Sequence, residues 1–231
     1  MILVDRPEHG QEIDKLDSMY PTKMISISKA YTFYDNHCTM FGVVTGGKFE
    51  ITSQVYQNQN AGQTYQIRAG NFMSIKTGFM AKPLEPNSQM FAIIRYGYVG
   101  LEMIGQIEDK GRLAYIDGCT DTLLVAPPRK GDACLNFLHF PPNIKQTQHL
   151  HPSIRMGVVV HGEGVAWQDK NWEYPLIKGA MFCLEEGETH SFKTTTNIMN
   201  IIAYHPDSDF GPTDENHPML NKTLINHGAN S

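Results

Sequence analysis

The residues best suited to chemistry in this sequence are three histidines. His149 and His151 are separated by one residue, and His190 follows an apolar run and the turn Glu185-Glu186-Gly187. Side chains at i and i+2 of a strand point to the same face, so the first two imidazoles can reach one ion. An antiparallel neighbouring strand would place His190 across from them. The pattern indicates a metal site; the alternative is a strand with two unrelated polar positions.

Arg155 lies on the same strand face as the two histidines by parity. An arginine is cationic and cannot bind a metal ion. It can clamp a carboxylate beside the metal, since a guanidinium binds carboxylates with paired hydrogen bonds. Alternatively, the side chain turns out of the protein at a bulge and pairs with a surface acid. Both interpretations stay open at this point.

The elements that must position these residues are predicted to be strands. Short runs of β-branched and aromatic residues recur along the chain, and Gly, Asn, Asp or Pro bounds most of them. This spacing predicts an all-β barrel or sandwich. A single short helix is predicted over residues 10–19, and the chain from Pro206 is predicted to be an arm or tail. The main runs are FGVVTGGKFEI, TYQIRA, MFAIIRYGYVG, LNFLHF, MGVVV, GVAW and IMNIIAY.

Three segments in the first half of the sequence have similar counterparts in the second half, in the same order. The segment from Met40 (MFGVVTGGKF) matches that from Arg155 (RMGVVVHGEG), and the segment from Met90 (MFAIIRYGY) matches that from Ile198 (IMNIIAYHP). Between them, IRAGNFMSIKTG matches LIKGAMFCLEEG, with Gly70 aligned to Gly179 and Gly78 to Gly187. Three ordered matches indicate a duplicated β-unit of roughly 80–90 residues.

The histidine segments resemble the two motifs of the cupin superfamily. The first motif is a glycine, HxH, three or four residues, Glu, six residues and Gly; here His149-x-His151 is followed by Arg155 and Gly162. The second is Gly, five residues, PxG, two residues and His; here Gly179 leads to His190. The resemblance covers about residues 120–205, and residues 25–110 resemble the same fold without its metal motif.

This sequence departs from the cupin pattern at three places. Glu185 replaces the proline of the second motif, and the upstream glycine of the first is absent, Asn143 being the nearest turn residue. Arg155 replaces the metal-binding glutamate. The resemblance therefore implies a ligand set of histidines only: His149, His151 and His190.

The resemblance implies two tandem cupin-type antiparallel β-barrels, jelly-roll-like, with few short helices. We expect an N-terminal segment (1–24), a degenerate N-terminal barrel (25–112), a metal-binding C-terminal barrel (113–205) and a C-terminal arm (206–231). In the N-terminal copy, Ala81 aligns with His190, and FYDN (33–36) aligns with the HxH pair. His37 stands alone there, so we expect one metal ion per chain.

Three protein ligands would leave coordination positions open, as in catalytic metal sites. Fe(II) is favoured by the resemblance, with Zn, Mn, Ni or Cu as alternatives. The implied function is that of an Fe(II) dioxygenase acting on a small carboxylate substrate, whose anionic end Arg155 would orient. A redox-neutral isomerase or lyase is the second hypothesis, and a non-enzymatic ligand-binding protein is the third. The titratable candidates for the second are His139, His161, Glu186, Glu188 and Tyr204.

Composition excludes other classes of partner. The net charge is −5 with no basic block, so neither nucleic acid nor a membrane surface is expected as a partner. The start MILVDRPEHG does not resemble a secretory signal, and the four cysteines form no CxxC, so we expect a cytoplasmic protein with free buried thiols. His205 and His217 are interpreted as surface residues. The arm ends in apolar residues that we expect to pack on their own chain or on the mate of a homodimer: Met219, Leu220, Leu224 and Ile225.

Overall fold

The computed structural model describes residues 1–56, 59–60, 62–168, 172–220 and 223–224. In this part the chain is all β, apart from one 3-10 turn, η1 (Ile116–Gly118). The strands of the first half are β1 (Ile2–Val4), β2 (Glu12–Lys15), β3 (Thr22–Ile27), β4 (Tyr31–Phe33), β5 (Cys38–Gly46), β6 (Lys48–Ser53), β7 (Val55–Tyr56), β8 (Gln59–Asn60), β9 (Thr64–Arg68), β10 (Asn71–Lys76), β11 (Phe79–Pro83), β12 (Gln89–Tyr96) and β13 (Met103–Gln106). Those of the second half are β14 (Leu113–Ala114), β15 (Thr120–Val125), β16 (Cys134–Phe140), β17 (Arg155–Gln168), β18 (Trp172–Ile177), β19 (Met181–Leu184), β20 (Ser191–Lys193) and β21 (Met199–His205).

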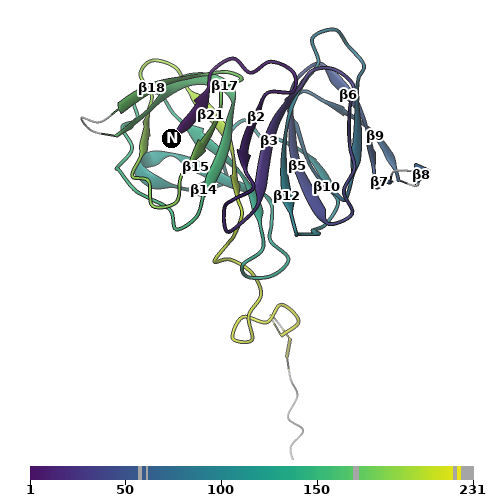
Figure 1. Cartoon of the computed structure of the whole chain (residues 1–231). Coiled ribbons are helices and arrows are strands. Elements are labelled where there is room, and N and C mark those ends of the chain that lie inside the picture. The colour runs from purple at the N-terminus through teal and green to yellow at the C-terminus, as the bar shows by residue number, and fades with distance from the viewer. Residues whose placement is uncertain (57–58, 61, 169–171, 221–222, 225–231) are drawn as a thin grey trace, which may run out of the picture.

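The strands form two barrel-like bodies that lie side by side (Figure 1). In the first, a six-stranded sheet of order β13-β10-β5-β12-β3-β2 faces a four-stranded sheet of order β4-β11-β6-β9. In the second, the sheet order is β1-β19-β17-β21-β16-β15-β14, with β18 and β20 also paired to β17. The pairings of these two bodies are antiparallel, as the cupin resemblance implies.

The helix predicted over residues 10–19 is wrong. Residues 12–15 form β2, which pairs with β3 and buries Ile13. The segment has only one buried apolar residue to anchor it, and pairing with the edge of an existing sheet satisfies its backbone groups. Tertiary context therefore overrides a weak local helix preference.

The two bodies share a backbone conformation at one pair of glycines that the sequence repeat aligns. Gly47 and Gly162 occupy equivalent places and both have positive φ, 58° and 70°. At Gly162, β17 leaves one set of neighbours, β19 and β21, and pairs next with β18 and β20. A Cβ at Gly162 would lie 1.9 Å from the carbonyl oxygen of Ile198, so the crossing requires glycine.

Three hydrophobic clusters hold the molecule together. One fills the interior of the first barrel, one fills the interior of the second, and the largest lies between them with residues from both halves. In this shared cluster the rings of Phe41 and Tyr204 lie 5.2 Å apart. The N-terminal strand β1 adds a further connection, because it pairs with β19 of the second barrel. The two barrels are thus one packed body.

Along β17, alternate residues serve the two clusters. Met156 and Val158 point into the shared cluster, whereas Val159 belongs to the interior of the second barrel. Arg155 shares the parity of Val159 and therefore points inward. The same alternation along β21 and β16 decides which of their polar residues reach the barrel interior.

The C-terminal arm runs away from both barrels (Figure 1). Met219, Leu220 and Leu224 are exposed, and Ile225 lies outside the described residues.

The prediction of free buried thiols is confirmed for Cys38, Cys119, Cys134 and Cys183. In the part of the chain that the structure describes, no helix is long and apolar enough to cross a membrane.

Candidate metal centre

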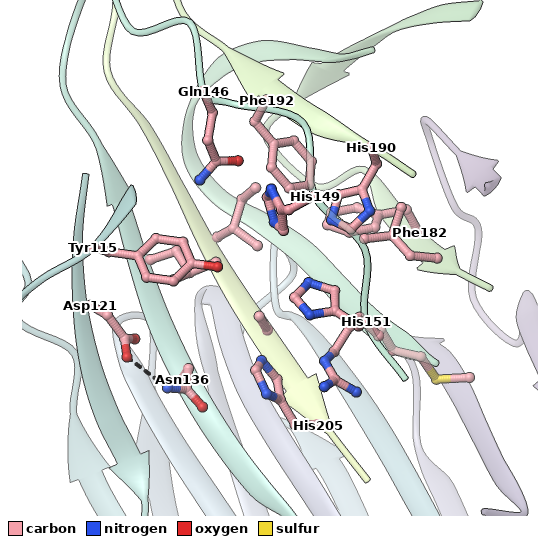
Figure 2. A pocket seen from close by; sticks show the side chains of 16 residues that line it. Tyr115, Asp121, Asn136, Gln146, His149, His151, Phe182, His190, Phe192 and His205 are labelled. Carbon is pink, nitrogen blue, oxygen red and sulfur yellow. Dashed lines mark hydrogen bonds between the residues drawn. The ribbon is translucent and has the colours of Figure 1, made fainter. Parts of the chain in front are cut away.

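The three histidines lie together in the second barrel. His149 and His190 form an isolated antiparallel bridge, and His151 follows on the same face just before β17. One nitrogen from each ring lies within 4.8 Å of the others. Metal–nitrogen bonds of 2.0–2.1 Å keep two ligand atoms of one ion within about 4.2 Å, so small side-chain movements suffice. Figure 2 shows the three rings gathered on one wall of a cavity.

Backbone carbonyls fix the ring orientation of two of these histidines. Nδ1 of His149 lies 2.9 Å from the Thr147 carbonyl, and Nδ1 of His190 lies 2.9 Å from the Glu188 carbonyl. A carbonyl only accepts, so each Nδ1 carries the proton and each Nε2 keeps its lone pair. Nε2 of His190 is buried and has no hydrogen-bond partner among the described residues. This is the arrangement of a metal-binding imidazole.

The environment keeps the imidazoles of His151 and His190 neutral. Burial lowers the pKa of His151 to about 3, with a further contribution from the positive charge of Arg155. Burial likewise lowers the pKa of His190 to about 4. A neutral imidazole is the form that binds a metal, so these two rings are ready to bind at neutral pH without losing a proton. The donor set therefore fits a divalent transition metal.

The equivalent place in the first barrel is filled by aromatic rings. The registers of β6 with β11 and of β17 with β20 match His190 to Phe79, so the predicted match to Ala81 is wrong by two residues. The same pairing matches His149 to Phe33. The rings of Phe33 and Phe79 lie 5.8 Å apart, and His37 is exposed outside them. Among the described residues, only the second barrel brings three such ligands together.

Arg155 combines features of both interpretations. Its buried side chain lines the cavity, as the parity predicts, and it also pairs with an acid: Nη1 lies 3.4 Å from Oδ1 of Asp207. The same Nη1 donates to the hydroxyl of Ser153. Nε of Arg155 is buried without a partner in the described chain. One edge of the guanidinium is thus fixed by the protein, and a donor remains unused.

The wall opposite the histidines is polar, and sequence reasoning missed it. Figure 2 shows Tyr115, Asp121 and Asn136 facing the triad across the cavity. His205, interpreted from the sequence as a surface residue, lines the same cavity, with its ring 6.1 Å from that of His151. The alternation of side chains along β21 could have predicted this position, because His205 continues the inward-facing series of Ile201 and Ala203.

The other titratable candidates lie outside this cavity. His139 contacts Asn200 through Nδ1, 2.7 Å away. Glu186 is exposed, and Glu188 pairs with the N-terminal amine of Met1. His161 is exposed, and Tyr204 is buried between the barrels. None of the five lines the cavity with the triad.

Comparisons with known proteins identify the architecture. No protein-family model and no curated protein sequence matches the chain. Among solved structures, a cupin 2 conserved barrel domain protein from Leptotrichia buccalis superposes with a TM-score of 0.57 at 14% identity, over 89% of this chain and 96% of that one. This chain has the cupin fold.

Two enzymes of the same fold are similarly distant. Oxalate decarboxylase from Bacillus subtilis, described with Mn(II) centres, gives a TM-score of 0.53 at 7% identity, over 90% of this chain and 76% of that one. A variant of salicylate 1,2-dioxygenase from Pseudoaminobacter salicylatoxidans gives a TM-score of 0.57 at 11% identity, over 81% of this chain and 70% of that one. At such identities the likeness establishes the fold alone.

Proposed function

We propose that this protein is a metal-dependent enzyme in which His149, His151 and His190 hold one divalent ion. The observation that carries the proposal is the cluster of three imidazoles, with the Nε2 atom of His190 buried and unpartnered. A buried polar atom without a partner costs free energy, and an ion at the centre of the triad would remove that cost. Fe(II) is the favoured metal, with Zn, Mn, Ni or Cu as alternatives.

The ligand set favours catalysis over a structural role for the metal. Structural zinc sites use four protein ligands, whereas three leave positions for a substrate. Three neutral ligands leave the full charge of a divalent ion in the cavity, and Arg155 adds a further positive charge. This electrostatic field favours an anionic ligand, and the unused donor of Arg155 would bind its carboxylate.

The reaction that we propose is dioxygenation of a small carboxylate substrate. When bound, Fe(II) would supply redox chemistry and the open positions at which a substrate is activated. The chain supplies the rest: Arg155 orients the anionic end, and apolar side chains such as Phe182 and Phe192 line the cavity and limit access of water. The similar fold of salicylate 1,2-dioxygenase supports this reaction class as an analogy.

A redox-neutral lyase or isomerase is the second candidate. The observation in its favour is the polar wall, where Tyr115 and Asp121 could exchange protons with a bound substrate. Burial raises the pKa of both side chains, which brings Asp121 closer to the range useful for proton transfer. The fold is shared with oxalate decarboxylase, which supports this alternative by analogy.

One experiment separates the two reactions. The protein is purified without oxygen, loaded with Fe(II), and screened against small carboxylates with an oxygen electrode. A dioxygenase consumes oxygen only when both Fe(II) and its substrate are present. Turnover of a substrate under strict anaerobiosis would instead establish the redox-neutral reaction. The His190→Ala variant controls for reactions of free iron, because it lacks one ligand of the triad.

A further inference from the structure

The polar wall opposite the triad contains a carboxylate that is only half satisfied. Nδ2 of Asn136 donates to Oδ2 of Asp121 at 2.8 Å. The other oxygen, Oδ1, is buried and has no hydrogen-bond partner among the described residues. A buried carboxylate oxygen without a donor is costly, so the structure holds an acceptor that a bound molecule would satisfy.

Gln146 adds a second unsatisfied group to the same cavity. Its side chain is 1% exposed, and neither its amide oxygen nor its amide nitrogen has a partner in the described chain. Figure 2 shows its amide near His149, on the side of the cavity toward Tyr115. A free donor and a free acceptor in one buried amide indicate a position where a polar ligand is recognised.

The first barrel serves as an internal control for three other polar residues of this cavity. Its strand registers place Ile25 where the second barrel has Asn136, Ile94 where it has His205, and Met40 where it has Arg155. These apolar counterparts are buried in the interior of the first barrel. The same barrel therefore folds with an apolar interior at these positions, and folding alone does not require polar side chains there.

We propose that Asp121 and Gln146 recognise the ligand in addition to the triad, and that the ligand is a short carboxylate with a hydroxyl or amino group at its far end. This inference rests on the proposed function and names its substrate class. The carboxylate would face the triad and Arg155, while the far donor reaches Oδ1 of Asp121 and Gln146 fixes the orientation. Asp121 thereby determines specificity, because an analogue without the donor leaves its oxygen unpaired.

The size of the cavity restricts the ligand further. The space open to the centres of water-sized groups is about 50 Å³. One water needs roughly 10–15 Å³ on this measure, so only a few such groups fit beside the triad. A chain of three or so carbons between the walls agrees with this volume.

A pair of isosteric acids tests the inference by binding alone. Co(II) replaces the air-sensitive Fe(II), and calorimetry measures the affinity of the Co(II)-loaded protein for 3-hydroxypropanoate and for butanoate. The two acids have the same number of non-hydrogen atoms, but only the first carries a donor. We expect the wild type to bind 3-hydroxypropanoate about 10-fold more tightly or better, as for a hydrogen bond to a charged group.

Substitutions of Asp121 assign the preference to its oxygen. Asp121→Leu should remove the preference, so that the two acids bind with equal affinity. Asp121→Asn keeps the shape of the side chain and should lower the preference at least about threefold, which covers the case in which Asp121→Leu does not fold. Glu186→Gln is the matched control, because Glu186 is exposed near the triad and does not line the cavity.

The possible failures are distinguishable. A wild type that does not bind Co(II), or that binds neither acid with Co(II) in place, overturns the proposed function. A wild type that binds Co(II) and butanoate but shows no preference for 3-hydroxypropanoate overturns only the role of Asp121. A preference for 3-hydroxypropanoate that persists in both Asp121 variants likewise overturns only the role of Asp121.

Discussion

His149 and His190 exchange two backbone hydrogen bonds, with N···O distances of 3.0 and 2.9 Å in the two directions. This bridge joins the loop before β17 to the loop before β20, at a point where neither segment belongs to a longer ladder. The backbone of both residues is thus held independently of their side chains. The imidazoles project from a fixed base, which is the condition for a preformed metal site.

His190→Ala is expected to remove the metal and keep the fold. The backbone bonds with His149 persist in the variant, while one of three ligands is lost. Metal analysis of the purified proteins should give one ion per wild-type chain and less than about a tenth of that in the variant, since second-best sites bind much more weakly. His161→Ala is the control, because His161 is exposed on β17 outside the cavity. A variant that retains full metal content contradicts the ligand set.

The metal is expected to stabilise the native protein. A ligand that binds only the folded state at 100 times its Kd adds about 2.7 kcal/mol to the free energy of unfolding. Thermal melts of the wild type should shift upward when Fe(II) or Co(II) is added after chelator treatment, and His190→Ala should show no such shift. An equal shift in both proteins would place the ion elsewhere.

Arg155→Met is expected to separate ligand binding from metal binding. Methionine stands at the equivalent position of the first barrel, so the barrel interior accepts it. Loss of the guanidinium should lower the affinity of the Co(II)-loaded protein for butanoate about 10-fold or more, as for a lost charged hydrogen bond. Co(II) binding should remain or improve, since a nearby positive charge is gone. Arg112→Met, at an exposed side chain paired with Glu108, provides the control.

Phe79→Ala is expected to have the opposite effects from His190→Ala. The phenylalanine is fully buried in the first barrel at the position equivalent to His190. Its truncation should lower the free energy of unfolding by about 3–5 kcal/mol, measured by urea denaturation. Metal content of the protein that remains folded should stay at one ion per chain. Reduced metal content in folded Phe79→Ala would show that the first barrel contributes to the site.

Gly162→Ala is expected to destabilise the second barrel. The added methyl would meet the Ile198 carbonyl oxygen, and the positive φ disfavours any side chain. A cost of about 1–3 kcal/mol follows from the strain alone. Gly131→Ala is the comparison, because its φ is also positive but no atom lies within 4 Å of the added carbon. Equal melting temperatures for the two variants would argue against the contact as the cause.

The fold and the triad could be predicted because their signals are local. Short runs of β-branched and aromatic residues indicate strands directly, and the spacing of His149 and His151 sets a shared face without knowledge of the rest of the chain. The repeat gave the order of the strands in both halves. Its alignment failed at Ala81 because the loop before β20 is two residues longer than the loop before β11, and no pattern in the sequence marks the insertion.

The polar wall could not be read from the sequence with the same ease. Asp121 and Asn136 lie on strands with hydrophobic residues on both faces. The alternation of side chains therefore does not tell which face lines the barrel interior until the packing of the barrels is known. Asp207 is a different case. It follows the last strand, in the segment assigned to the arm, and its contact with Arg155 depends on tertiary structure alone.

The pairing of β1 with β19 has a consequence for how the chain is made. Residues 2–4 leave the ribosome well before their partners, residues 181–183. The shared hydrophobic cluster likewise needs strands from both halves. Neither barrel reaches its final packing while the other is still being synthesised, so the nascent first half must remain soluble with one sheet face uncovered. A chaperone that protects such a face would raise the yield of folded protein, and expression at lower temperature would have the same effect.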